Sequence, residues 1–195
     1  MLKKSYNNIN IFSFIRKKVL IMKKNTQDIL FSNEFMDIVM INPNYPFLQM
    51  KKYGVVTIPY DKNGNIYMLH KSRNNIGKYY ELPRGFVEHK EDFQTGALRE
   101  LLEETGMKAG KITRLSKVQP DTGLLSNNVE IIALEVLEKD DNSYSHYDSV
   151  DNESNLVVKL NESQINNLLL NNEIICGYTM SALFLFKTFK QYNKI

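Results

Sequence analysis

Hydrophobic residues recur along this chain with two different periods. Alternating or β-branched apolar runs are typical of strands, and they occur in residues 33–42, 53–60, 66–70, 111–120, 129–138 and 156–160. Apolar residues spaced three or four apart are typical of helices, and they occur in residues 92–104, 161–172 and 178–192. Strands that precede and follow a central helix predict an α/β fold, with an α/β/α sandwich around a mixed β-sheet.

Turn and cap residues mark where the predicted elements begin and end. Asn63 and Gly64 lie in the sequence DKNGN between two apolar runs, which predicts a β-hairpin. Gly106 follows the central helix and predicts its end. The next helix has two candidate N-caps, Asn161 and Ser163.

Two segments follow neither period. Residues 42–47, NPNYPF, indicate a turn-rich linker. Residues 139–154 are polar and form a stretch too long for an ordinary connection, so we predict an exposed loop there. Whether this loop has a function is left open by its composition.

The length of 195 residues and an apolar share of 43% predict a single domain with a substantial core. We divide the chain into a basic N-terminal extension (residues 1–24), an N-terminal strand and linker (25–52) and a main domain (53–195). The extension contains lysines and arginines but no acidic residue. Either it is a short basic arm, or the true start is Met22 rather than Met1.

Charge and cysteine content exclude several classes of protein. The net charge of +3 is mild, so neither nucleic acid nor a membrane is expected as a partner. No run reaches the roughly 18 apolar residues that a membrane-spanning helix needs. Cys176 is the single cysteine, which excludes an intrachain disulfide and a cysteine-based zinc site. One cysteine also fits a reducing compartment, and we expect a cytoplasmic protein.

The chemistry of the chain concentrates on the central helix. Glu100, Glu103 and Glu104 have offsets that place all three on one face of that helix. Glu100 and Glu104 are like charges four residues apart, which destabilises a helix. They also lie near the C-terminal end of the helix, where its dipole disfavours anions. Arg99 offsets only part of this charge. A divalent cation, Mg²⁺ or Mn²⁺, with a phosphate-bearing ligand would offset the rest. The alternative is a solvated acidic helix face.

A longer pattern surrounds these three glutamates. Residues 85–107 match every fixed position of G-x5-E-x7-R-E-U-x-E-E-x-G-U, where U is a bulky apolar residue. With average residue usage, a chance match at a given site is well below about one in a million. The segment therefore resembles the Nudix box, and the chain resembles the Nudix hydrolase superfamily over most of residues 53–190.

This resemblance implies a fold, a reaction and a cofactor. The fold would be a single-domain α/β/α sandwich of the Nudix type around a mixed sheet. The reaction would be the hydrolysis of a nucleoside diphosphate linked to another group, which gives two monophosphates. The cofactor would be Mg²⁺, with Mn²⁺ as the alternative. The family also implies a homodimer and a small nucleotide substrate.

The resemblance further implies a metal site and its catalytic residues. Glu100 and Glu104 match the main metal ligands, and Glu103 matches an additional ligand or, in some members, the base. The backbone carbonyl of Arg84 is the expected fourth ligand. Together with Arg99, the three glutamates form the expected catalytic set.

The remaining box positions are expected to shape the site. Gly85 permits the sharp turn that enters the loop, and Gly106 ends the helix. Glu91 and Arg99 would hold the loop and helix rigid through charged hydrogen bonds. Glu88 lies outside the fixed pattern and is expected to face solvent.

The residues around the box resemble one group within the superfamily. ELPRGFVE resembles the ELPAGxxE entry of the ADP-ribose and nucleoside-diphosphate-sugar pyrophosphatases, which indicates Glu81 and Arg84 as substrate contacts. Arg73 ends LHKSR, where that group has a QxR strand end, and it is a candidate phosphate ligand. The chain departs from the group in two ways. Arg84 replaces a small residue, and Pro120 and Gly123 are separated where the group has them adjacent.

Three points stay open at this level. The group carried by the nucleoside diphosphate is not specified. The general base is expected in the acidic loop after the box, unless that loop is merely solvated. The candidates are Glu138, Asp140, Asp141, His146, Asp148, Asp151 and Glu153. Two other functions compete: a hydrolase of nucleoside triphosphates or dinucleoside polyphosphates, and a nucleotide-sensing module that does not cut its ligand.

Overall fold

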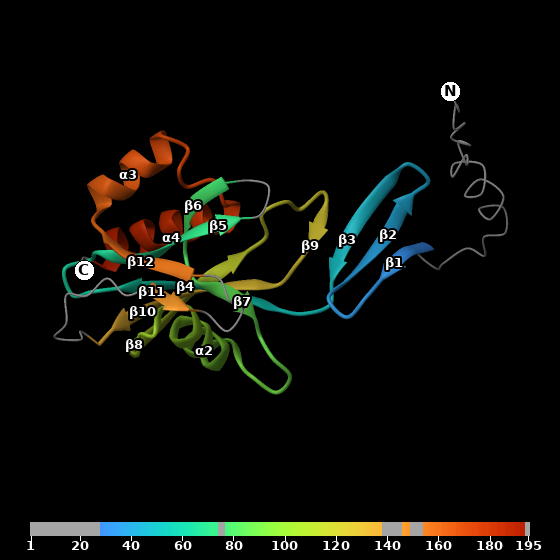
Figure 1. Cartoon of the computed structure of the whole chain (residues 1–195). Coiled ribbons are helices and arrows are strands. Elements are labelled where there is room, and N and C mark those ends of the chain that lie inside the picture. The colour runs from blue at the N-terminus through green and yellow to red at the C-terminus, as the bar shows by residue number, and fades with distance from the viewer. Residues whose placement is uncertain (1–27, 74–76, 138–145, 149–153, 194–195) are drawn as a thin grey trace, which may run out of the picture.

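The computed structural model describes residues 28–73, 77–137, 146–148 and 154–193, and its centre is a large mixed sheet (Figure 1). In the described residues this sheet has the order β11-β12-β5-β4-β10-β8, with β6 attached to β5 and β7 to β4. Its strands are β4 (Gly54–Tyr60), β5 (Ile66–Arg73), β6 (Gly77–Glu81), β7 (Arg84–Phe86), β8 (Ala109–Val118), β10 (Val129–Val136), β11 (His146–Asp148) and β12 (Ser154–Leu160). β4 pairs with β10 in parallel, and β10 pairs with β8 in antiparallel.

Helices cover both faces of this sheet (Figure 1). The helices are α2 (Phe93–Thr105), α3 (Glu162–Leu170) and α4 (Gly177–Asn193). Side chains alternate along a strand, so β10 supplies Ile131 and Ala133 to the core under α3 and α4, and Ile132 and Leu134 to the core under α2. The predicted α/β/α sandwich around a mixed sheet is confirmed. None of the described helices is long and apolar enough to cross a membrane.

The ends of the helices follow the predicted signals. α2 begins after Asp92, whose Oδ1 accepts a hydrogen bond from the Thr95 N–H at 2.7 Å. It ends at Gly106, which has a left-handed φ of 68°. For α3, the structure selects Asn161 rather than Ser163 as the N-cap. These local signals set the bounds of α2, which packs against β4 and β7.

The predicted hairpin is correct at its turn but not along its strands. Gly64 has a φ of +79°, and Asp61 Oδ1 accepts from the Asn63 and Asn65 N–H groups at 3.0 and 2.9 Å. Within the described residues, β4 and β5 pair at only one position, between Tyr60 and Ile66. Beyond it, β5 pairs with β6 and β12, while β4 pairs with β7 and β10. The box entry at β7 is therefore held against β4.

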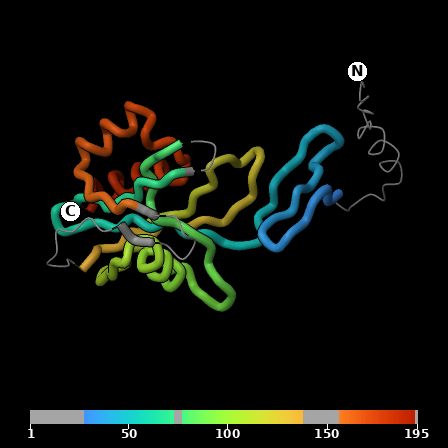
Figure 2. Tube along the Cα trace, viewed as in Figure 1, coloured from blue at the N-terminus to red at the C-terminus, as the bar shows by residue number. Residues whose placement is uncertain are grey.

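A smaller sheet extends away from the body (Figure 2). In the described residues it consists of β1 (Asp28–Ser32), β2 (Met36–Asn42), β3 (Tyr45–Met50) and β9 (Leu125–Ser126). The predicted turn-rich linker at residues 42–47 is correct at residues 43–44, which form the turn between β2 and β3, but wrong at Tyr45–Phe47, which belong to β3. Pro46 is tolerated because β9 pairs only with Leu48 and Gln49, further along β3.

The prediction of a loop over residues 139–154 needs one correction. β11 lies inside that range and pairs with β12 in antiparallel, so part of it is a strand. Residues 138–145 and 149–153 lie outside the described residues. The boundaries proposed for the domains, at residues 24 and 52, stay predictions.

Candidate active site

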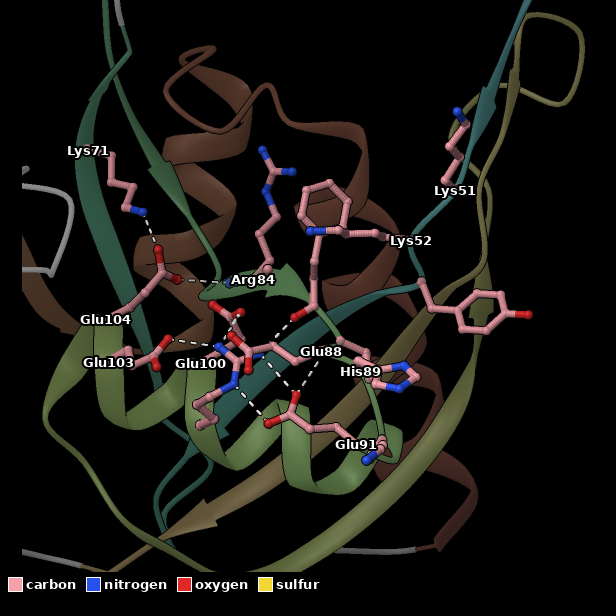
Figure 3. A pocket seen from close by; sticks show the side chains of 16 residues that line it. Lys51, Lys52, Lys71, Arg84, Glu88, His89, Glu91, Glu100, Glu103 and Glu104 are labelled. Atoms are coloured by element: carbon pink, nitrogen blue, oxygen red, sulfur yellow. Dashed lines mark hydrogen bonds and ion pairs between the residues drawn. The ribbon is translucent and has the colours of Figure 1, made fainter. Parts of the chain in front are cut away.

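The predicted acidic residues line a single cleft of about 850 Å³ (Figure 3). Its acidic wall comes from α2 and from the loop between β7 and α2. Its basic wall comes from the segment between β3 and β4, from β5 and from β7. The charged lining residues are Lys51, Lys52, Lys71, Arg84, Glu88, His89, Lys90, Glu91, Arg99, Glu100, Glu103 and Glu104. A cleft with cations facing clustered carboxylates suits a phosphate ester held through a divalent ion.

Arg99 ties the box together. Its guanidinium donates to Glu91 Oε1 at 2.9 Å, to Glu100 Oε1 at 2.9 Å and to Glu103 Oε2 at 2.8 Å. It also donates to the Phe86 carbonyl at 2.7 Å, which joins the helix to β7. The hydrogen bond from Arg99 is the main cause that lowers the pKa of Glu91. The arginine therefore fixes both the loop and two of the three central glutamates.

We expect Arg99→Lys to lower the free energy of unfolding by about 2 kcal/mol, because an ammonium cannot reproduce the planar fork of donors. Urea denaturation of the two proteins measures this difference. Lys62→Arg, on the exposed turn between β4 and β5, is the control and should leave stability unchanged. If Arg99→Lys were as stable as the wild type, the hydrogen bonds of Arg99 to Glu91 and Phe86 would not be what holds the loop in place.

Glu100 is the most buried of the three glutamates, and the residue is 8% exposed. It fits there because Gly85 has no side chain: a Cβ at that position would lie 2.0 Å from Glu100 Oε1. Burial raises the pKa of Glu100 to about 7, the charges of Glu104 and Glu103 act in the same direction, and Arg99 opposes them. A cation bound at this carboxylate would favour its charged form.

The raised pKa of Glu100 predicts a pH dependence for the metal-free protein. Its folded-state pKa lies above the ordinary 4.5, so the folded chain binds this proton more tightly than the unfolded chain does. This contribution to stability is present below pH 4.5 and is lost as the pH rises through 7.

We expect the free energy of unfolding of the wild type, relative to Glu100→Gln, to fall by about 2 kcal/mol across that window. Urea denaturation in a chelator at a series of pH values measures it. A difference between the two proteins that stays constant with pH contradicts the assignment. The comparison with the variant removes the contributions of other carboxylates.

Glu104 is held by the sheet rather than by Arg99. The buried Lys71 on β5 forms an ion pair with Glu104 Oε1. The backbone N–H of Arg84 donates to Glu104 Oε2 at 2.9 Å. The resemblance implied the backbone carbonyl of Arg84 as a metal ligand, whereas the backbone group of Arg84 that contacts Glu104 is its N–H. Lys71 was not predicted, because a lysine in a strand gives no signal of this partner.

The donor set fits a hard divalent cation. Carboxylate oxygens are the ligands that Mg²⁺ and Mn²⁺ prefer, and three such side chains line one cleft. In this conformation, no three Asp, Glu, His or Cys side chains of the described residues are close enough to hold an ion. Lys71 contacts Glu104, and Arg99 contacts Glu100 and Glu103. Metal binding therefore requires a change in these side-chain contacts.

The three predicted substrate contacts have different surroundings. Arg84 lines the cleft, and its guanidinium lies 5.5 Å from the ring centroid of Tyr178 on α4. Glu81 is buried, is not among the residues that line the cleft, and contacts Arg84 at 3.4 Å. Arg73 ends β5, and its side chain lies outside the described residues. Glu88 is exposed, as predicted.

The candidate general bases cannot be compared with the cleft. Glu138, Asp140, Asp141, Asp151 and Glu153 lie outside the described residues. His146 and Asp148 belong to β11, and their side chains are not described. The identity of the base stays a prediction.

Comparisons with known proteins agree with this geometry. The NUDIX domain family matches residues 50–164. An uncharacterized Nudix hydrolase of Schizosaccharomyces pombe is 31% identical over 111 residues, which cover 55% of this chain and 54% of that protein. The ADP-ribose pyrophosphatase of Saccharomyces cerevisiae is 34% identical over 87 residues, covering 43% of this chain and 38% of that protein.

These matches therefore span about half or less of the curated relatives. A crystal structure of an ADP compounds hydrolase has the same fold, with a TM-score of 0.61, 18% identity and coverage of 89% of this chain and 98% of that one. The family match covers more than half of the chain, and the charged residues at the fixed positions of the box line one cleft of the same fold. The chain belongs to the NUDIX domain family.

Proposed function

We propose that this protein hydrolyses the phosphoanhydride bond of a nucleoside diphosphate linked to another group, with ADP-ribose or a similar nucleoside-diphosphate sugar as the substrate. The observation that carries the proposal is the single cleft in which Glu100, Glu103 and Glu104 face Lys71 and Arg84. The similarity to an ADP-ribose pyrophosphatase supports the choice of substrate.

The residues of the cleft have different roles in the proposed reaction. Glu100, Glu103 and Glu104 would hold Mg²⁺ or Mn²⁺, with the Arg84 carbonyl as a further proposed ligand. A bound cation would polarise the phosphoryl oxygens and lower the pKa of a bound water. Arg99 fixes Glu100 and Glu103 at distances of 2.9 and 2.8 Å. Lys71 and Arg84 contribute positive charge beside the diphosphate.

The chemical step is the addition of water across the anhydride. The oxygen of a water molecule forms a bond to one phosphorus. The bond from that phosphorus to the bridging oxygen breaks, and the bridging oxygen leaves with the other phosphate. A base takes the proton of the water. Glu103, with a side chain that is 42% exposed, is more open to solvent than Glu100 or Glu104, and it can serve as that base if the acidic loop does not.

A panel of nucleotides tests the function. We expect turnover of ADP-ribose to exceed that of nucleoside triphosphates and dinucleoside polyphosphates, with two monophosphates as the products. Chromatography of the products with Mg²⁺ and with Mn²⁺ measures this. Faster hydrolysis of triphosphates would favour the competing hydrolase function. Binding of an intact nucleotide after long incubation would favour the sensing module.

Lys71 gives a second test, which does not depend on activity. We expect Lys71→Met to lower the thermal midpoint in a chelator, because the carboxylate of Glu104, whose side chain is only 12% exposed, then loses its ion-pair partner. Mg²⁺ should raise the midpoint of the variant by more than that of the wild type, because the cation no longer competes with an ammonium. Thermal unfolding with and without Mg²⁺ measures both. Equal Mg²⁺ shifts in the two proteins would contradict a role for Glu104 as a metal ligand.

We also propose a homodimer and a cytoplasmic location. Among the described residues, the small sheet has four large apolar side chains that are each about half exposed: Ile29, Leu30, Phe31 and Ile41. Such a surface on one sheet is typical of an interface. Light scattering of the full chain, and of a variant with Phe31→Asp, tests the dimer. The location rests on the single cysteine, Cys176.

A further inference from the structure

A second cavity, of about 440 Å³, adjoins the cleft of the box. The two share a wall that includes Lys71, Arg84 and Glu104. The far side of the second cavity is built by other elements, with Asn127 from the segment before β10 and Tyr178 from α4. A substrate whose diphosphate contacts the shared wall can therefore extend one of its two ends into this cavity.

Two residues that line this cavity each have a buried polar atom without a hydrogen-bond partner among the described residues. Asn127 donates through Nδ2 to Tyr178 Oη at 2.9 Å, and this leaves Asn127 Oδ1 without a partner. Arg84 lies over the Tyr178 ring, and its Nε is likewise buried and without a partner. Buried polar groups without partners cost free energy, so an acceptor and a donor left in this state indicate groups that a ligand pairs.

The remaining walls decide between the two ends of the substrate. Apart from the shared wall, Asn127 and Tyr178, the residues that line the cavity are apolar: Met50, Val55, Val56, Leu125 and Val129, with Gly54. A sugar has a hydroxyl on nearly every carbon, and most of these would be left unpaired here. A nucleobase has flat apolar faces and carries its donors and acceptors on one edge.

We propose that this cavity, and not the open cleft, binds the nucleobase of the substrate, with Asn127 accepting from and Arg84 donating to the edge of the base. This inference rests on the proposed function, since it assumes a nucleotide whose diphosphate contacts the box. Neither residue could be assigned this role from the box. Asn127 lies outside the box, and Arg84 stands where the resembling group has a small residue.

The two reaction products separate the halves of the substrate, and calorimetric titration of each product tests the proposal. We expect Asn127→Leu to weaken the binding of AMP about tenfold and to leave the binding of ribose 5-phosphate unchanged. Asn127→Asp keeps the acceptor oxygen and should stay within about threefold of the wild type. Asn128→Leu, at the exposed neighbouring position, is the matched control, and circular dichroism verifies folding.

The outcomes distinguish this inference from the function on which it rests. Unchanged AMP affinity in Asn127→Leu, or an equal loss for ribose 5-phosphate, would overturn the nucleobase site while ADP-ribose hydrolysis still stood. If the wild type bound neither product and hydrolysed no ADP-ribose, both proposals would be wrong. If Asn127→Leu does not fold, Tyr178→Phe replaces it, because this variant removes the hydroxyl that orients Asn127. A several-fold loss of affinity confined to AMP would support the inference. Unchanged AMP affinity would overturn it.

Discussion

Glu104→Gln is expected to lower kcat for ADP-ribose by about a thousandfold, because it removes a proposed metal ligand and its charge from the reacting phosphates. Glutamine keeps an oxygen that accepts from Lys71 or from the Arg84 N–H. The cost to the free energy of unfolding should therefore stay at about 1–2 kcal/mol. Steady-state kinetics at saturating Mg²⁺ and thermal unfolding measure the two effects.

The control for this variant is Glu88→Gln. Glu88 lines the same cleft and carries the same charge, but it is exposed and occupies a variable position of the box. We expect its kcat to remain within about threefold of the wild type, as for surface charges without a specific partner. Wild-type turnover of Glu104→Gln at saturating Mg²⁺ would contradict the metal assignment.

Gly85→Ala is expected to lower kcat by at least about a hundredfold. The new Cβ would lie 2.0 Å from Glu100 Oε1 and 2.1 Å from its carboxyl carbon, so the Glu100 carboxylate must move out of its position. Arg99 then loses one of its partners, and a proposed ligand leaves the cleft. Steady-state kinetics with increasing Mg²⁺ measures the loss, and higher Mg²⁺ should not restore it.

Gly110→Ala provides the comparison for a glycine outside the site. Its Cβ would lie 3.0 Å from the end of the exposed Leu137 side chain, which can rotate away. We expect near wild-type kcat for this variant. If Gly85→Ala also kept near wild-type kcat, the position of the Glu100 carboxylate in the structure would not matter for catalysis.

The acidic wall of the site could be predicted because its residues are contiguous in the chain. The N-cap Asp92 and the terminal Gly106 define α2 locally, and helical spacing then places the three glutamates on one face. Gly85 was assigned the turn that enters the loop. In the structure Gly85 lies instead within β7, paired with Val55, and its lack of a side chain makes room for the carboxylate of Glu100.

The basic wall could not be predicted in the same way. Lys71 contacts Glu104 across a separation of 33 residues, and Tyr178 contacts Arg84 from the last helix. No local pattern encodes such contacts, because they depend on which strands pair in the sheet. The strand at Tyr45–Phe47 was missed for a related reason. Pro46 favours a turn locally, but strand pairing overrides that preference.

The most direct test of the proposed reaction is hydrolysis of ADP-ribose in ¹⁸O-labelled water, followed by mass spectrometry of the products. We predict AMP and ribose 5-phosphate, with one labelled oxygen in the phosphate of only one of them, and no products when a chelator removes the divalent cation. Intact ADP-ribose after prolonged incubation with saturating Mg²⁺ or Mn²⁺, or turnover that continues in the chelator, would contradict the account.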